Sequence, residues 1–312
     1  MNTLREAVRE YLDMRRNLGF KMQGADRPLL DFVTFMEKRR AVYVTDRLAL
    51  TWAQQPSGVR PAYWAKRLRL VRGFARHRSA TDPRTQVPPA TLLPHRPQRA
   101  RPYLYTQTEI RRLLSAARRM PSGPGAGLRP WTYYSLFGLL SVSGLRIGEA
   151  CSLEVRDVDL KKAILTVRDG KFGKSRLVPL HDSTCKVLAD YIARRKRFLS
   201  GRPASHLFIS LRGNRLDGGE IRRTFYALSR QIGLRGQSDS HGPRLHDMRH
   251  RFAVQTLLRW YRAGEDADRR LPILSAYLGH VHVADTYWYL SQWPELMQEA
   301  MKRLERRWEH RS

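Results

Sequence analysis

Six side chains between residues 146 and 289 have the chemistry needed to attack a phosphodiester without a metal ion. They are two arginines, a lysine, two histidines and a tyrosine: Arg146, Lys171, His246, Arg249, His280 and Tyr289. Guanidinium groups bind the non-bridging oxygens of a phosphate bidentately and keep their charge. They accelerate a reaction only if they bind the more negative transition state more tightly than the ground state. We therefore predict that Arg146 and Arg249 act together on one phosphate.

Tyr289 is the candidate nucleophile, and its hydroxyl needs help from its neighbours. A phenol has a pKa near ~10, so only about one in a thousand is ionised at pH 7. A nearby proton acceptor and a cationic field can activate it. We predict that His246 takes the proton or orients the phenol, and that His280 binds a phosphate oxygen. The leaving 5′-oxygen needs a proton, for which Lys171 is the candidate acid.

A second tyrosine, Tyr287, is the alternative nucleophile. It stands two residues before Tyr289 and would face the same way in an extended segment, because side chains alternate along a strand. The position of Tyr289, nine residues after His280 and directly before Leu290, favours Tyr289.

His250 opens a different alternative, which is a metal site. It lies four residues after His246, and His280 and His282 could supply further ligands. However, no glutamate follows His246 in the pattern of metalloproteases. The two cysteines lie elsewhere in the sequence. We therefore expect neither a metal ion nor another cofactor.

The composition indicates a polyanionic partner. The 312 residues include 58 lysines and arginines against 28 aspartates and glutamates, a formal charge of +30. Such an excess favours nucleic acid, because each neutralised phosphate releases counterions. A membrane surface is the competing partner, but no apolar run approaches the ~20 residues of a span.

The cysteines and the start of the chain bear on the compartment. Two cysteines exclude a disulfide framework and suit a reducing compartment. The first residues have a helical pattern and no signal-peptide pattern. We expect a cytoplasmic protein that associates with a bacterial nucleoid.

Residues 1–80 predict a small, all-helical, basic domain. Apolar residues recur at helical spacing over 3–18 and 27–40, and further helices open at Thr45 and at Pro61. The last of these helices carries a run of basic residues: Lys66, Arg67, Arg69, Arg72 and Arg76. A solvated face is the alternative explanation, but charge of almost one sign favours a helix that faces phosphates.

Residues 81–102 predict a linker. Prolines and scattered arginines replace the periodic pattern, and a proline-rich chain is semi-extended. Such a segment could pass around a DNA duplex or serve as a plain spacer, and both interpretations stay open.

Residues 103–293 predict a second domain that combines helices with a small β-sheet. Strands are expected at 163–167 and 176–180, with Lys171 and Lys174 on their connection. Pro179 cannot donate a backbone hydrogen bond, so we place its strand at an edge. Lys174 is also a candidate DNA contact, as are Arg176 and Arg244.

The expected helices of this domain position the arginines and histidines. They cover residues 106–117, 131–140, 182–199, 218–232, 246–261 and 273–278, with a short strand at 207–210 and a charged loop at 262–272. A turn at Gly144 should fix Arg146 behind a buried helix. His246 and Arg249 are three residues apart, so both should project from the first turn of their helix, where anions are favoured. Residues 294–312 predict an amphipathic helix, and its packing in cis or in trans stays open.

These residues also resemble the sequence boxes of the tyrosine recombinases, the phage-integrase family. Residues 143–149 resemble the first arginine box, and residues 246–250 resemble the H-x-x-R box. Leu278-Gly279-His280, followed by Tyr289, resembles the final box. Residues 170–180 resemble a β-hairpin whose first lysine is catalytic in that family, which favours Lys171 over Lys174. The match covers residues 104–290, and the tyrosine segment is most similar to recombinases of transposons that carry several such genes.

The resemblance implies a fold and a reaction. The fold is mainly α with a small β-sheet or hairpin, in which a helical N-terminal core-binding domain precedes an α+β catalytic domain. Tyr289 would form a 3′-phosphotyrosyl link, and the freed 5′-hydroxyl of a partner duplex would resolve it, as in the integration or excision of a mobile element. The implied partners are double-stranded DNA with a specific recombination site and either a homo-tetramer or an assembly with sister recombinases.

Three other functions fit parts of the same pattern. A catalytically silent DNA-binding accessory subunit predicts the loss of one of the six residues, and all six are present. A type IB topoisomerase would relax any supercoiled plasmid without a partner. A site-specific repressor would bind DNA without forming a covalent adduct.

Overall fold

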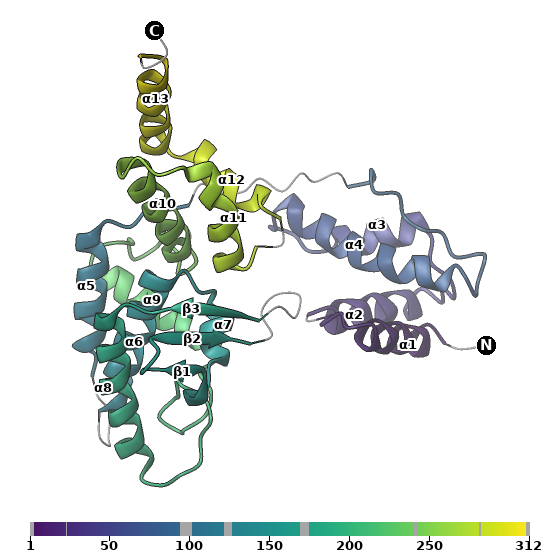
Figure 1. The fold of residues 1–312 in the computed structure, drawn as a ribbon. Coiled ribbons are helices and arrows are strands. Elements are labelled where there is room, and N and C mark those ends of the chain that lie inside the picture. Colours follow the sequence, from purple (N-terminus) through teal and green to yellow (C-terminus); the bar gives the residue numbers. More distant parts are fainter. Residues whose placement is uncertain are drawn as a thin grey trace. The chain divides into compact units, whose positions relative to one another are not determined.

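The computed structural model describes residues 3–22, 24–93, 102–121, 127–168, 175–239, 242–280 and 282–309. As predicted, the described chain is mainly helical with one small antiparallel sheet (Figure 1). Its elements are α1 (Leu4–Asn17), α2 (Asp26–Glu37), α3 (Asp46–Gln54), α4 (Pro61–Arg78), α5 (Gln107–Arg118), α6 (Leu128–Ser143), α7 (Ile147–Ser152), the 3-10 helix η1 (Val155–Asp157), β1 (Val158–Asp159), β2 (Ile164–Val167), β3 (Arg176–Pro179), α8 (Asp182–Leu199), α9 (Gly218–Gln231), α10 (Asp247–Arg262), α11 (Ala267–Leu278), α12 (Ala284–Gln292) and α13 (Pro294–Glu309). The chain divides into two compact units, residues 1–100 and residues 101–312. None of the described helices is long and apolar enough to cross a membrane.

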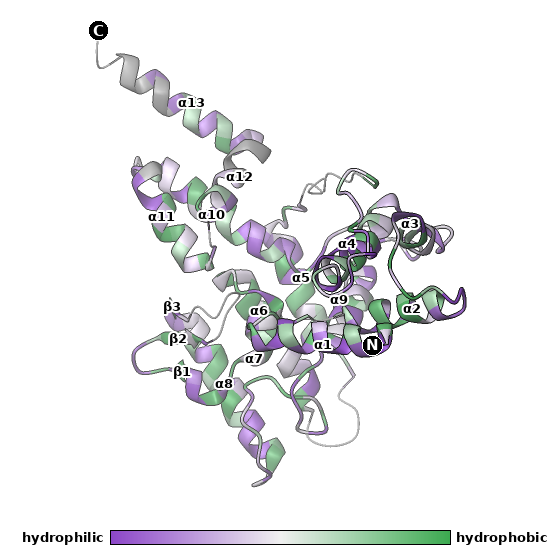
Figure 2. Ribbon diagram, turned by 90° about the vertical axis from the view of Figure 1, so that its right-hand side faces the viewer, coloured by the Kyte–Doolittle hydropathy of each residue, from purple (hydrophilic) through white to green (hydrophobic). Residues whose placement is uncertain are grey.

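The first unit is a bundle of α1 to α4 around its own apolar core. The Thr3 hydroxyl accepts a hydrogen bond from the backbone of Glu6, whose carboxylate accepts one from the backbone of Thr3, so the two residues form a capping box at the start of α1. Pro61 occupies the first position of α4, where its missing N–H is not needed. Phe32, Trp52 and other apolar side chains fill the core. Figure 2 shows polar and apolar residues interleaved along these helices, as expected when each helix buries one face.

The second unit begins with helices that pack around the small sheet. α5, α6 and α8 lie side by side, and the core includes Phe137 of α6 and Tyr191 of α8 (Figure 1). The strands pair in the order β1-β2-β3, with Ile164 opposite Pro179. Pro179 therefore lies on an edge strand, as predicted. The strand predicted at residues 207–210 is wrong, because only isolated pairings form there, one of them between Ile209 and Arg215.

The last four helices form a second apolar cluster in this unit. Leu257 of α10, Leu274 of α11, Tyr289 of α12 and Leu296 of α13 all contribute to it. The loop predicted at residues 262–272 is wrong, because α11 begins at Ala267 and contains Pro272 inside the helix. The buried Leu271 and Leu274 explain why, since their packing outweighs the helix-breaking tendency of proline.

Candidate active site

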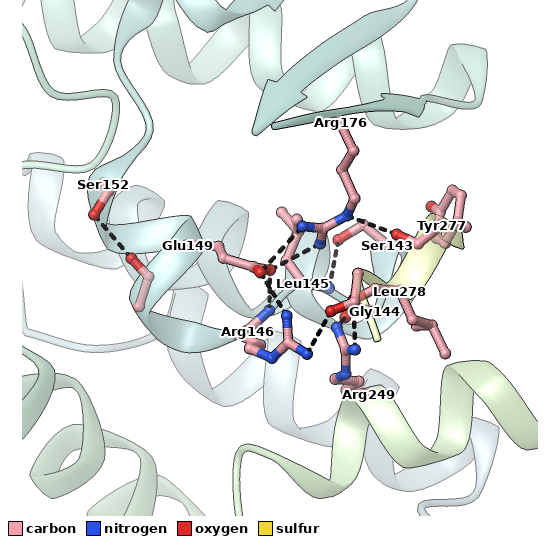
Figure 3. Close-up of polar contacts among 12 residues, drawn as sticks. Ser143, Gly144, Leu145, Arg146, Glu149, Ser152, Arg176, Arg249, Tyr277 and Leu278 are labelled. Atoms are coloured by element: carbon pink, nitrogen blue, oxygen red, sulfur yellow. Dashed lines mark hydrogen bonds and ion pairs between the residues drawn. The ribbon is translucent and has the colours of Figure 1, made fainter. Parts of the chain in front are cut away.

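The C-terminal end of α11 holds three arginines that come from three separate segments (Figure 3). Arg176 donates to the carbonyl of Tyr277 at 2.6 Å, and Arg249 donates to the carbonyl of Leu278 at 2.5 Å. Arg146 donates to the carbonyl of the next residue, Gly279, at 3.0 Å. The last carbonyls of a helix lack partners within the helix and carry the negative end of its dipole. They therefore suit guanidinium groups, and they bring these three close together.

Two glycines make these contacts possible. Gly144 ends α6 with a φ of 62°, and its carbonyl accepts a hydrogen bond of 2.7 Å from Arg249. Gly279 follows α11 with a φ of 66°. A Cβ atom at Gly279 would lie 3.0 Å from a guanidinium nitrogen of Arg176. Both positions thus combine a left-handed backbone with a close approach, which glycine alone meets without strain.

Glu149 joins two of the arginines. Its carboxylate accepts hydrogen bonds from the side chain and the backbone of Arg146, both at 2.8 Å. It also accepts two from Arg176, at 3.1 and 2.9 Å. Burial acts to raise the pKa of Glu149, but the hydrogen bonds from Arg176 and Arg146 outweigh it and lower the pKa to about 2. Glu149 is therefore an anion at neutral pH and fixes the direction of both guanidinium groups.

Arg249 is the most deeply buried of the three arginines, with 2% of its surface exposed. Burial, and next the positive charge of Arg146, lower the pKa of Arg249 to about 10. The group remains charged at neutral pH, and the carbonyls of Gly144 and Leu278 satisfy it. A buried cation held in this way is ready to bind an anion without first losing rotational freedom.

Arg176 has a structural role that the sequence did not reveal, and its assignment as a DNA contact stays a prediction. Its side chain is 12% exposed, and its guanidinium nitrogens are bonded to Glu149 and to the carbonyl of Tyr277. The sequence could not reveal this role, because Glu149 lies 27 residues away along the chain. Arg176 supports Arg146 through their shared carboxylate instead of presenting itself at the surface.

The phenol of Tyr289 lies on the neighbouring helix α12 and is buried, with 2% of the residue exposed. Its hydroxyl lies 3.2 Å from Nδ1 of His250. The ring of His280 stacks at a centroid distance of 6.3 Å, and Nδ1 of His280 is hydrogen-bonded to Thr286 at 2.8 Å. Tyr289 also interacts electrostatically with Arg249. The structure therefore brings together four of the six predicted residues, with His246 next to them.

Tyr287 does not share the orientation of Tyr289. The segment is helical, not extended, so residues two apart point to different sides of α12. Tyr287 is 47% exposed, whereas Tyr289 faces the core. The expectation that both tyrosines face the same way in an extended segment is wrong.

The two histidines at the start of α10 are neutral at physiological pH. His246 caps the helix and reaches the surface, and its ring contacts that of His250 at a centroid distance of 4.8 Å. Partial burial, and next the charge of Arg249, lower the pKa of His246 to about 4. Burial, and next His246, lower the pKa of His250 to about 3. Either ring can therefore accept a proton from a phenol or hydrogen-bond to it.

His250 is the residue that the sequence-based assignment missed. The sequence suggested it only as a metal ligand, and among the described residues no cluster of three or more His, Cys, Asp or Glu side chains could hold a metal ion. The signal was its spacing, because four residues after His246 is one helical turn along the same face. What the sequence could not supply was the partner, Tyr289, which lies 39 residues away.

Two candidates, Lys171 and Lys174, lie outside the described residues. Arg244 is paired with the buried carboxylate of Asp247 at 2.9 Å and keeps 44% of its side chain exposed. Its assignment as a DNA contact stays a prediction.

The basic run of α4 divides into two groups. Lys66, Arg69 and Arg76 are exposed, and their role as DNA contacts stays a prediction. Arg72 is half-buried and donates to the carbonyls of Pro88 and Pro89 at 2.6 and 2.9 Å.

Arg67 differs from the other basic residues of α4, because its side chain points inward. The residue is 8% exposed, its guanidinium lies 3.7 Å from the ring centroid of Trp52, and it donates to the carbonyl of Trp52 at 3.0 Å. A weaker contact of 3.4 Å reaches Asp31. A charge run read along the sequence does not reveal which residues of the helix face the core, and Arg67 lies on that face.

Residues 104–295 match the phage integrase family. The chain belongs to this family. A relative described as "Putative integrase/recombinase y4rB" from Sinorhizobium fredii (strain NBRC 101917 / NGR234) is 63% identical over 314 residues, which cover 100% of both chains. Tyrosine recombinase XerD of Caulobacter vibrioides is 30% identical over 233 residues, 74% of this chain and 71% of XerD. This member of the phage integrase family is thus a tyrosine-type recombinase that acts in site-specific DNA recombination.

Solved structures share the fold. The Tn1549 transposon integrase in complex with transposon right end DNA has a TM-score of 0.66 at 17% identity, over 98% of this chain and 99% of that one. The XerH site-specific recombinase bound to its difH substrate has a TM-score of 0.63 at 19% identity, over 89% of this chain and 78% of that one. At this level of identity the likeness concerns the fold alone.

Proposed function

We propose that the protein cuts and rejoins DNA at a specific recombination site through a covalent bond between Tyr289 and a 3′-phosphate. The Tyr289 oxygen attacks the scissile phosphorus, and the bond from phosphorus to the 5′-oxygen breaks. Arg146 and Arg249 bind the non-bridging oxygens. His246 takes the proton of the phenol or orients it, and His280 binds a phosphate oxygen. Lys171 gives a proton to the leaving 5′-oxygen. The 5′-hydroxyl of a partner duplex then attacks the phosphotyrosyl bond, so the bond energy is conserved and no nucleotide cofactor is consumed.

One observation carries this proposal. Arg146 and Arg249 are tied to the carbonyls of two consecutive residues, Gly279 and Leu278, and Tyr289 lies within electrostatic range of Arg249. Two fixed guanidinium groups, one of which interacts electrostatically with the phenol, form an arrangement that suits attack on a phosphodiester. It requires only that DNA bring its phosphate to the guanidinium groups.

The biological setting we propose is the integration or excision of a mobile element. Two relatives, 63% and 33% identical to this chain, occur in a single strain of Sinorhizobium fredii, and both are described as integrases or recombinases. This supports an assembly of sister recombinases on DNA, with a homo-tetramer as the other form. In either assembly, α13 would contribute the exposed side chains of Met297 and Met301 to subunit contacts.

A nicked suicide duplex made from the DNA that flanks the gene tests the proposal. The nick lets the short 5′-hydroxyl strand diffuse away, so a covalent protein–DNA adduct accumulates and migrates slowly in a denaturing gel. We expect the adduct with the wild type and with Tyr287→Phe, and none with Tyr289→Phe. An adduct that survives Tyr289→Phe, or DNA binding by the wild type without any adduct, would refute the proposal and favour a different nucleophile or a silent DNA-binding protein.

A further inference from the structure

His250 is the imidazole that the structure sets against the nucleophile. Its Nδ1 lies 3.2 Å from the Tyr289 hydroxyl, and the two rings meet edge to face at a centroid distance of 5.4 Å. The ring of His246 contacts that of His250 at a nearly perpendicular angle, and Nδ1 of His280 is hydrogen-bonded to Thr286. Among these three histidines, His250 is therefore in position to exchange a proton with the phenol.

The same helix fixes His250 and the phosphate-binding arginine. Arg249 and His250 are consecutive in α10, and Arg249 is held on both sides by the carbonyls of Gly144 and Leu278. The backbone that carries the fixed guanidinium of Arg249 therefore also positions the imidazole that contacts the phenol of Tyr289.

We propose that His250 accepts the hydrogen bond of the Tyr289 phenol, holds its oxygen in line with the phosphate and takes its proton as the new bond forms. The inference rests on the proposed function, in which Tyr289 is the nucleophile. It assigns to His250 the role that the sequence alone suggested for His246.

In the proposed cleavage step, the Tyr289 oxygen forms a bond to phosphorus, and the phenolic proton passes to Nδ1 of His250. The bond from phosphorus to the 5′-oxygen breaks, and that oxygen receives a proton from the acid, which is Lys171 in the proposed function. Nδ1 can accept only in the tautomer that carries its hydrogen on Nε2. In the rejoining step the proton returns from His250 to the phenol oxygen.

The charges around His250 make its proton affinity depend on whether the DNA phosphate is bound. Burial, and next the interaction with His246 and the positive charges of Arg244 and Arg249, lower its pKa to about 3. A bound phosphate places negative charge beside Arg249 and offsets that field. The proton affinity of His250 should therefore rise when DNA is present, at the moment when a base is needed.

Two variants of His250 separate its roles. His250→Asn keeps an acceptor near the position of Nδ1 but cannot take up a proton, whereas His250→Leu removes both functions at similar volume. The matched control is Arg259→Lys, at an exposed position of the same helix, and it should cleave at the wild-type rate. All three are measured in single-turnover cleavage of the nicked suicide duplex, together with DNA binding and thermal unfolding.

A second substrate shows whether a variant impairs the attack by the phenol or the protonation of the leaving 5′-oxygen. In this duplex, sulfur replaces the 5′-bridging oxygen of the scissile phosphate, and sulfur leaves without needing a proton because a thiol is far more acidic than an alcohol. We expect His250→Asn and His250→Leu to cleave ~10²–10⁴-fold more slowly than the wild type on both duplexes. Lys171→Ala should be slow on the oxygen duplex and recover on the sulfur duplex.

The dependence of the rate on pH supplies the readout that a structural role would not change. Without an internal base, cleavage by His250→Asn should rise about tenfold per pH unit over the range in which the wild type is level, because phenolate then forms only by loss of a proton to solvent. Unfolding temperature and DNA affinity of His250→Asn should match those of the wild type.

Three outcomes would overturn the proposed role of His250. Cleavage by both His250 variants at the wild-type rate, with Tyr289→Phe inactive, overturns the role of His250 and leaves the proposed function standing. A loss of stability or DNA affinity in His250→Asn that accounts for the slower cleavage, with the pH profile unchanged, overturns it as well. Absence of any adduct with the wild type overturns the proposed function and this inference together.

Discussion

The exposed basic side chains of α4 and the arginines at the end of α11 use the same kind of charge in different ways. Lys66, Arg69 and Arg76 are exposed on their helix. Arg146 and Arg249, by contrast, are fixed to backbone carbonyls by hydrogen bonds of 3.0 Å or less. An exposed cation attracts a polyanion from a distance and tolerates many geometries. A fixed guanidinium can stabilise charge that develops at a single place, which is what catalysis requires.

The largest effect should come from changing a fixed arginine. Arg249→Lys keeps the charge but loses the planar fork that reaches two carbonyls and a phosphate. We expect single-turnover cleavage of the suicide duplex to fall by ~10²–10³-fold, with DNA affinity nearly unchanged. Arg69→Lys on α4 is the matched control and should cleave at the wild-type rate. An equal loss of cleavage rate in both variants would contradict the distinction between the fixed arginines and the exposed basic residues of α4.

Glu149 gives the next largest effect, and its pH dependence has a definite sign. Its pKa is lowered to about 2 in the folded protein, so the unfolded chain binds a proton first as the pH falls. The stability that Glu149 contributes, ~3 kcal/mol from the shift, is present above about pH 4.5 and is lost toward pH 2. Denaturant unfolding at a series of pH values should show this loss in the wild type, and Glu149→Gln should flatten it. A wild-type stability that is constant between pH 5 and pH 3 would contradict the network around Glu149.

Arg67 should behave as a core residue despite its place in a basic run. Arg67→Leu removes a stacking contact with Trp52 and a hydrogen bond to its carbonyl. We expect the free energy of unfolding to fall by ~1–3 kcal/mol, measured by denaturant titration. The folded fraction should bind DNA with the same salt dependence as the wild type. A reduced salt slope at unchanged stability would return Arg67 to the DNA-binding set.

The exposed charges of α4 should give the smallest effect for each residue. The triple variant Lys66→Gln, Arg69→Gln, Arg76→Gln should bind DNA more weakly and lower the slope of log affinity against log salt by ~0.9 for each phosphate that the helix no longer neutralises. Cleavage at saturating protein should stay unchanged, because exposed charges that bind phosphates add affinity without stabilising the transition state more than the ground state. Fluorescence anisotropy across a range of salt concentrations measures the slope. An unchanged slope would mean that α4 faces away from DNA.

Local signals in the sequence were reliable guides to the fold. The capping boxes opened by Thr3 and Thr106 and the proline at the start of α4 mark helix starts in the structure. Each involves residues within one helical turn, so the sequence contains every interacting group. The beginning of α11 was missed because charged residues and Pro272 indicated a loop. Its helical state depends instead on the packing of Leu271 and Leu274 against other helices.

Long-range partners set the limit for the site. The types and spacing of the six candidates predicted the chemistry, and the resemblance named the family that the comparisons then bore out. The partners of Arg176 and His250 could not be read in this way, because Glu149 and Tyr289 lie 27 and 39 residues from them. A local sequence pattern does not predict which distant carboxylate or phenol a side chain will contact in the folded protein.

The carbonyl groups at the C-terminal end of α11 also compensate part of the positive charge of the three arginines. Three guanidinium groups that repel one another are gathered around the carbonyls of Tyr277, Leu278 and Gly279, and the carboxylate of Glu149 offsets part of their charge. This internal compensation lowers the cost of holding the three cations together, and the positive charge that remains is available to attract a phosphate.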